Sequence, residues 1–176
     1  METNETKTLV HHDLLTSFSE AARFKGFSPD KRLLLFASDI SRVWRHSFTA
    51  RYVVYDPATD TATTVTDPEG GETLQHCAWV ENSEAANTLL YVSGNNMYWR
   101  RVGGDEGDIA ITESGAADSV FNGVPDWVYE EEVLFSSTAH YLNTPGDLVA
   151  YAQFNDTLVK EFQYPVYGDQ SVRTRA

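Results

Sequence analysis

The segment DWVYEEEV at 126–133 places three consecutive glutamates, residues 130–132, directly after an aspartate and three apolar residues. Neighbouring carboxylates repel one another, so a triplet that is held close to the fold favours a positive partner. A primary ammonium has one positive charge and three N–H donors, which two carboxylates can accept. A solvated turn explains the same run, and the residues alone leave both interpretations open. We expect Asp126 to cap a short helical turn and the apolar residues 127–129 to anchor it.

A second stretch that could bind a ligand is VWRHSFTARY at 43–52. In it, Arg45 lies between Trp44 and His46, just before an expected strand. A guanidinium presents five donors in a fixed fork, which suits a carbonyl or a carboxylate. The same residues are explained by Arg45 stacking on Trp44, an exposed contact that contributes about 0.5–1 kcal/mol. Taken alone, the stretch favours the stacked arrangement.

Other catalytic and metal-binding patterns are absent from the sequence. It contains no G-x-S-x-G elbow, Walker A loop, G-x-G-x-x-G turn or H-E-x-x-H pair. The histidines include no pair at helical i, i+3 or i, i+4 spacing, and the adjacent His11 and His12 point apart. Cys77 is the only cysteine, which excludes an internal disulfide and a thiolate metal site. We therefore predict no metal site and no cofactor.

The composition indicates a folded protein that does not bind polyanions. The 176 residues are 41% hydrophobic and 12% aromatic, which is typical of one globular domain with a sizeable core. A net charge of −13 argues against a nucleic-acid partner and against an anionic membrane surface. No apolar run is long enough to cross a bilayer, and the first residues lack the apolar core of a signal peptide.

Short strands separated by turns run through the whole sequence and predict an all-β fold. The pair 50–56 and 61–66 forms a hairpin around a Pro- and Asp-containing turn. The remaining expected strands are 32–38, 73–80, 88–93, 97–102, 108–112, 133–141, 148–154 and 158–164.

A turn followed by an apolar strand recurs at 27–38, 79–93 and 141–154, at intervals of about 50 to 60 residues, the length of one four-stranded propeller blade with its loops. About three blades follow from this, too few to close a ring of about four or more. We therefore expect an incomplete β-propeller over 27–176, after a weakly patterned segment over 1–26. An open array leaves strand edges unpaired, so we expect the isolated chain to be marginally stable or a homo-oligomer.

Four segments together resemble the N-terminal β-propeller domain of the dipeptidyl peptidase IV family, which belongs to the prolyl-oligopeptidase-like serine peptidases. These segments are SPDKRLLLF (28–36), VWRHSFTARYVVYD (43–56), FNGVPDWVYEEEV (121–133) and LVAYAQFNDT (148–157). The resemblance implies a propeller stacked on an α/β-hydrolase domain, with a peptide substrate held between the two. It also implies that Glu131 and Glu132 grip the free N-terminal ammonium of the peptide and that Arg45 holds a peptide carbonyl.

The resemblance does not extend to the catalytic machinery. The nucleophile, aspartate and histidine of the family belong to the hydrolase domain, which is absent from this sequence, so we expect no hydrolysis by the chain alone. The family also contains members without peptidase activity that regulate channels, so an interaction module is the alternative function. The resemblance implies the extracellular side of the plasma membrane, or secretion, and Asn155 in N-D-T matches the glycosylation pattern.

Overall fold

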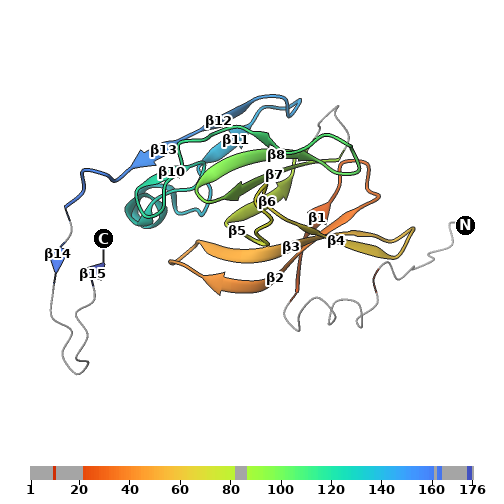
Figure 1. The fold of residues 1–176 in the computed structure, drawn as a ribbon, viewed down its shortest axis with the longest axis horizontal. Helices are drawn as coiled ribbons and strands as arrows, with labels where there is room; N and C mark the ends of the chain where they lie inside the picture. Colours follow the sequence, from red (N-terminus) through yellow and green to blue (C-terminus); the bar gives the residue numbers. More distant parts are fainter. Residues whose placement is uncertain (1–9, 11–21, 82–86, 161, 164–173, 176) are drawn as a thin grey trace, which may run out of the picture.

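The computed structural model describes residues 10, 22–81, 87–160, 162–163 and 174–175 of the 176. Within these residues the regular structure consists of short antiparallel strands and one helical turn, which confirms the all-β prediction. Figure 1 shows the first sheet, the second sheet and a group of shorter strands following one another across the molecule. This succession of sheets is a partial β-propeller.

The first sheet has five strands, with the predicted apolar runs at its centre. β1 (Arg23–Phe27), β2 (Leu34–Arg42), β3 (Phe48–Asp56) and β4 (Thr61–Val65) pair in this order, and β5 (Thr73–Leu74) also pairs with β3. The predicted hairpin over 50–66 is confirmed, because Asp56 pairs with Thr61 across the turn at 57–60. β1 straddles the boundary that the sequence predicts between residues 26 and 27.

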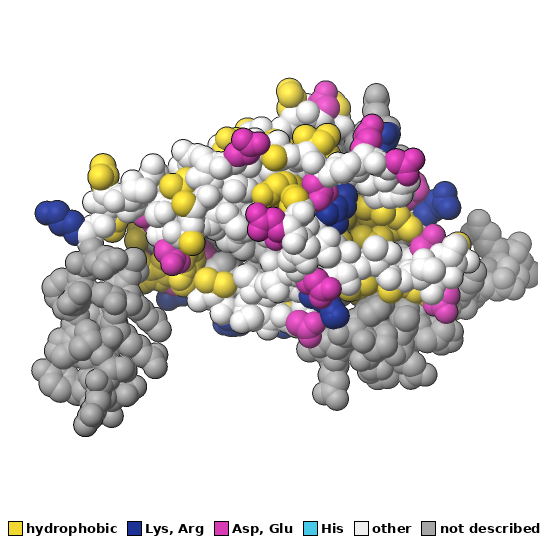
Figure 2. Space-filling view, viewed as in Figure 1, with side chains coloured by type: hydrophobic (Ala, Val, Ile, Leu, Met, Phe, Trp, Pro, Cys, Tyr) yellow, Lys and Arg dark blue, Asp and Glu magenta, His cyan; other side chains and the backbone are white. Residues whose placement is uncertain are grey.

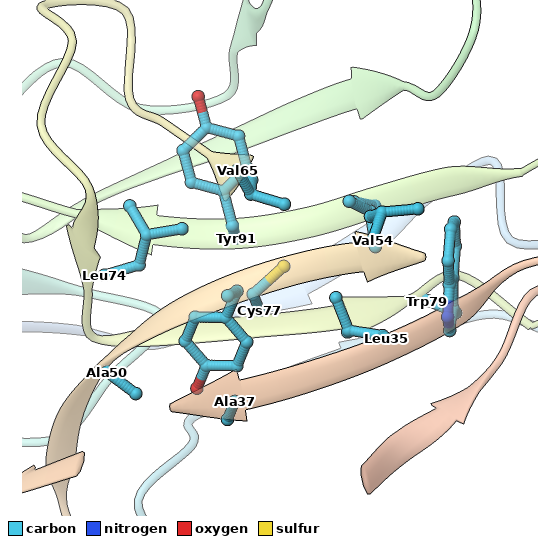
Figure 3. Close-up of a cluster of buried hydrophobic side chains, with 11 residues drawn as sticks. Leu35, Ala37, Ala50, Val54, Val65, Leu74, Cys77, Trp79 and Tyr91 are labelled. Atoms are coloured by element: carbon cyan, nitrogen blue, oxygen red, sulfur yellow. The ribbon is translucent and has the colours of Figure 1, made fainter. Parts of the chain in front are cut away.

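The second sheet packs against the first through one shared core. It contains β6 (His76–Trp79), β7 (Thr88–Ser93), β8 (Asn96–Arg101) and β9 (Ile109–Ala110), paired in chain order. Figure 3 shows Leu35 and Val54 of the first sheet meeting Cys77 and Trp79 of the second, and all four belong to one buried cluster. Side chains alternate between the faces of a strand, so β2 also buries Leu34 and Phe36 on its opposite face.

The third part of the fold is made of shorter pairs. β10 (Val120–Asn122) pairs with β13 (Gln153–Asn155), β11 (His140–Leu142) with β12 (Val149–Tyr151), and β14 (Phe162–Gln163) with β15 (Thr174–Arg175). A second core joins this part to the far face of the second sheet, where Leu90 and Met97 meet Phe121 and Phe154. The described residues thus form two sheets of four or more strands and a third unit of two-stranded pairs.

Four expected strands differ from the structure. The expected strands 73–80 and 148–154 are each divided between two sheets, the first as β5 and β6 and the second as β12 and β13. The strand over 133–141 is wrong, because Val133 and Leu134 belong to a helical turn and β11 begins only at His140. Val133 is 54% exposed, so its apolar side chain was not a sign of strand burial. Of the expected strand over 158–164, the described residues pair only at 162–163.

The surface is predominantly acidic, in keeping with the net charge of −13. Figure 2 shows carboxylate side chains spread across one face of the molecule, with lysine or arginine beside several of them. None of the helical segments among the described residues has the length and apolar character that a bilayer crossing needs.

Candidate functional site

The glutamate triplet lies in a π-helical turn, η1 (Tyr129–Leu134). Asp126 holds its beginning, because its carboxylate accepts the Tyr129 N–H at 2.7 Å and its backbone carbonyl accepts the Glu130 N–H at 2.9 Å. The chain leaves the turn at Phe135 in the left-handed region, with φ 51° and ψ 37°, which is unusual for an aromatic residue. Single π-helical turns and left-handed non-glycine residues both concentrate at functional sites.

The apolar residues before the triplet do not anchor it as the sequence predicts. Trp127 is 52% exposed and Tyr129 is 45% exposed, although the Tyr129 ring contacts Phe154 at a centroid distance of 4.8 Å. Glu130 is the residue that is fully buried. A polar side chain therefore fastens η1 to the fold, which reverses the expected roles of these neighbours.

Glu130 reaches the loop between β2 and β3. Its carboxylate accepts the His46 N–H at 2.5 Å, and both of its oxygens lie 3.2 Å from the Ser47 nitrogen. The same loop is closed by a hydrogen bond from the Val43 N–H to the Ser47 carbonyl at 3.1 Å. The resemblance gives a role to Glu131 and Glu132 but none to Glu130, and the contact of Glu130 with the loop is seen only in the folded protein.

Arg45 occupies this loop and points at the triplet. One guanidinium nitrogen of Arg45 lies 3.1 Å from a carboxylate oxygen of Glu131, and the indole N–H of Trp127 donates to the other oxygen at 3.2 Å. The Arg45 side chain is 67% exposed, whereas that of Glu131 is 14% exposed. Trp44 instead lies near Phe121, with ring centroids 6.0 Å apart. The structure thus pairs two of the residues that the sequence analysis singled out.

Glu132, the third candidate, is exposed on the same turn. Among the residues that the structure describes, its carboxylate has no hydrogen bond or ion pair. The triplet is therefore divided into a buried carboxylate, a carboxylate shared between Arg45 and Trp127, and a carboxylate open to solvent. Three negative charges against the single cation of Arg45 leave the cluster with negative potential, which favours a cationic ligand.

A further carboxylate adds to this potential from β13's far end. Burial raises the pKa of Asp156, and repulsion by Asp126 together with a hydrogen bond between the two side chains raises it further.

The predicted glycosylation residue, Asn155, is exposed and lies directly before Asp156 in the sequence. Its side-chain oxygen accepts the Thr157 N–H at 3.1 Å and the Thr157 hydroxyl at 2.7 Å.

A pocket of about 380 Å³ opens beside the β2–β3 loop. Trp44 and Ser47 line one side of it, and Phe121 and Val124 line another. The buried Ser47 hydroxyl has no hydrogen-bond partner among the described residues. Arg45 and the three glutamates do not line this pocket. The charged cluster and the pocket are therefore separate features of the same region.

Two partly buried histidines outside the cluster lie against each other. The rings of His76 in β6 and His140 in β11 contact edge to face, with centroids 4.8 Å apart, and His140 Nδ1 lies 2.8 Å from the Gly123 carbonyl. Burial lowers the pKa of His76 to about 3. In the described part of the chain, no three His, Cys, Asp or Glu side chains gather as a metal site would require. Cys77 is buried in the first core, and burial raises the pKa of its thiol.

Comparison with known proteins identifies the family and the fold of this chain. The sequence profile described as "Dipeptidyl peptidase IV (DPP IV) N-terminal region" matches residues 28–175. In fold, the chain is similar to the crystal structure of Porphyromonas gingivalis dipeptidyl peptidase 4, with a TM-score of 0.69 and 22% identity over 85% of this chain and 21% of that one. The chain belongs to the dipeptidyl peptidase IV family, as an N-terminal propeller region.

Individual relatives include both peptidases and a protein named as inactive. Human prolyl endopeptidase FAP is 36% identical over 97% of this chain, and a probable dipeptidyl-aminopeptidase B of Neurospora crassa is 37% identical over 94%. Rat inactive dipeptidyl peptidase 10 is 34% identical over 93% of the chain. These matches cover 21%, 17% and 20% of the relatives, so the chain spans about a fifth of their length.

Proposed function

We propose that this chain is the propeller portion of a dipeptidyl-peptidase-like serine peptidase, and that it holds the amino terminus of a peptide substrate. In this proposal Glu131 and Glu132 receive the N-terminal ammonium, and Arg45 binds a peptide carbonyl. The observation that carries the proposal is the 3.1 Å contact between Arg45 and Glu131, because it joins two distant stretches of sequence into one charged cluster.

Each of these residues has a stated task in the proposed site. The Trp127 indole and the Arg45 guanidinium hold the Glu131 carboxylate in place, and the exposed Glu132 supplies a second anion on the same turn. Arg45 is mostly exposed and has five N–H donors, so it has donors left for a carbonyl. The chemistry is positioning, in which a fixed amino end sets the distance to the bond that is cut.

Cleavage in this proposal belongs to an α/β-hydrolase domain that the present sequence does not contain. The purified chain is expected to bind peptides without cutting them, and dipeptide release by the chain alone would contradict this division of labour. We further propose an extracellular or secreted location, with a glycan on Asn155. Its exposure and its N-D-T pattern support that modification.

An interaction module without peptidase activity is the second candidate function. It is supported by the 34% identity to rat inactive dipeptidyl peptidase 10. The two functions are distinguished by the coding sequence downstream of this segment. A G-x-S-x-G motif followed by Asp and His favours the peptidase, and a replaced serine favours the interaction module.

The binding proposal is tested by titrating the purified chain with a tripeptide that has a free amino terminus. NMR or calorimetry measures the affinity. The Glu131→Gln/Glu132→Gln variant should bind about tenfold more weakly or worse, since each lost contact is a charge-assisted hydrogen bond. Glu69→Gln/Glu106→Gln is the matched control, because it also removes two negative charges, from exposed positions outside the cluster. Equal binding of the N-acetylated tripeptide would refute the proposal.

A further inference from the structure

Glu130 has no task in the proposed ligand contacts, yet it is the most buried member of the triplet. Its side chain is fully buried and its partners are backbone N–H groups of the β2–β3 loop, which belongs to a different sheet. A carboxylate that accepts hydrogen bonds from main-chain N–H groups makes contacts that do not depend on the side chains of the loop. The contact therefore fixes the path of the loop backbone.

The two backbone N–H groups that donate hydrogen bonds to Glu130 belong to the residues directly after Arg45. His46 and Ser47 place consecutive N–H groups toward one carboxylate, an arrangement that backbone concavities use to bind anions. One residue earlier, Arg45 extends from the same loop, and one residue after Glu130, Glu131 meets it at 3.1 Å. Two neighbouring contacts thus join the same loop to the same turn, one through the backbone and one through side chains.

We infer that Glu130 is a positioning residue that sets the place of Arg45 relative to Glu131 and Glu132. The inference rests on the proposed function, in which Arg45 and the two glutamates bind different parts of one peptide. The Arg45 side chain is 67% exposed, and among the described residues one ion pair holds it, so its own contacts hold it weakly. The buried contact of Glu130 fixes the loop from which Arg45 extends, and the distance between the ammonium site and the carbonyl donor follows from it.

The experiment uses the purified chain carrying Glu130→Gln, which keeps the side-chain volume but offers one accepting oxygen in place of two. Urea unfolding first establishes that the variant is folded. NMR then measures hydrogen exchange at the His46 and Ser47 amides, which we expect to accelerate by about tenfold or more. The Nη–H groups of Arg45, one of which faces Glu131, should exchange faster as well. Glu69→Gln, at an exposed position outside the cluster, is the matched control, and it should leave all of these exchange rates unchanged.

The second readout is binding of the free-amino-terminal tripeptide. A folded Glu130→Gln chain should bind it about tenfold more weakly, and Arg45→Ala added to that background should cost little more, because Arg45 is already misplaced. Exchange rates equal to those of the unmodified protein would overturn the inference. Faster exchange with unchanged tripeptide affinity would also overturn it, since Glu130 would then hold the loop without any effect on the ligand.

The remaining outcomes separate this inference from the proposed function. If the unmodified chain binds no tripeptide, the proposed function fails, and the exchange rate of the Arg45 Nη–H groups still decides whether Glu130 positions Arg45. If Glu130→Gln does not fold, Glu130→Asp takes its place, because it keeps the charge and shortens the reach. Loss of folding in both variants would assign Glu130 to the core alone and would refute the positioning role.

Discussion

Among the described residues, His76 is expected to make the stability of this fold depend strongly on pH. Its ring lies in β6 against His140 of β11, so the contact joins the second sheet to the third unit. Burial lowers the pKa of His76 to about 3 from its usual 6.5, with further contributions from the charges of His140 and Lys25. The folded protein therefore keeps this imidazole neutral at pH values where the unfolded chain protonates it.

The sign and size of the effect follow from these two pKa values. Because the unfolded chain binds the proton more tightly, stability falls as the pH decreases below 6.5 and continues to fall until about 3. At pH 5 the unfolded imidazole is almost fully protonated and the folded one is not. The expected loss from this single group is about 2 kcal/mol between pH 7.5 and pH 5.

Urea unfolding followed by tryptophan fluorescence measures this loss at the two pH values. The unmodified chain should lose about 2 kcal/mol more than His76→Gln, which has no ionisable group at this position. His140 adds a smaller pH dependence in both proteins, since burial also lowers its pKa. His46→Gln is the control, because His46 is exposed. An equal loss of stability in the unmodified chain and in His76→Gln would refute the reasoning.

Three further outcomes are expected. Gly123→Ala should destabilise the fold by about 1–3 kcal/mol in urea unfolding, since Gly123 has φ +70° and an added Cβ would come within 2.5 Å of the Met97 sulfur; an unchanged midpoint would contradict this. Asp156→Asn should raise the melting temperature at pH 7, because its raised pKa makes the charged form unfavourable beside Asp126, and the gain should vanish well below pH 3.8. The chain should elute as an oligomer in size-exclusion chromatography with light scattering, and Tyr141→Lys should reduce this association, because Tyr141 is 67% exposed on a short strand pair; a monodisperse monomer would oppose that expectation.

The central strands could be predicted from the sequence because apolar runs indicate that these strands are buried. β7 is the clearest example, since all six of its residues are buried. β1 gives no such signal, because its sequence RFKGF carries two cations and its register shifts near Gly26. It is a strand only because β2 offers it a partner, so tertiary pairing decides its structure.

The sequence indicates which kinds of residue make up the candidate site, but it does not predict all of their contacts. The sequence indicates an acidic turn capped by Asp126, and the Asp126 carboxylate does accept the Tyr129 N–H. The contact between Arg45 and Glu131 was not predicted from the sequence and appears only in the structure. The sequence could not reveal which glutamate is buried, because the three are chemically identical. That choice depends on the amides of the β2–β3 loop, which local sequence does not place near residue 130.

The hydrogen bond from the His46 N–H to Glu130 also has a consequence for biosynthesis, because 84 positions separate its ends. Chain synthesis at about 5–20 residues per second delays Glu130 by about 4 to 17 s after His46 leaves the peptidyl-transferase centre. The His46 and Ser47 N–H groups therefore stay hydrogen-bonded to water until Glu130 has been synthesised. Contacts that close so long a segment form slowly and late, so the charged cluster is completed near the end of folding.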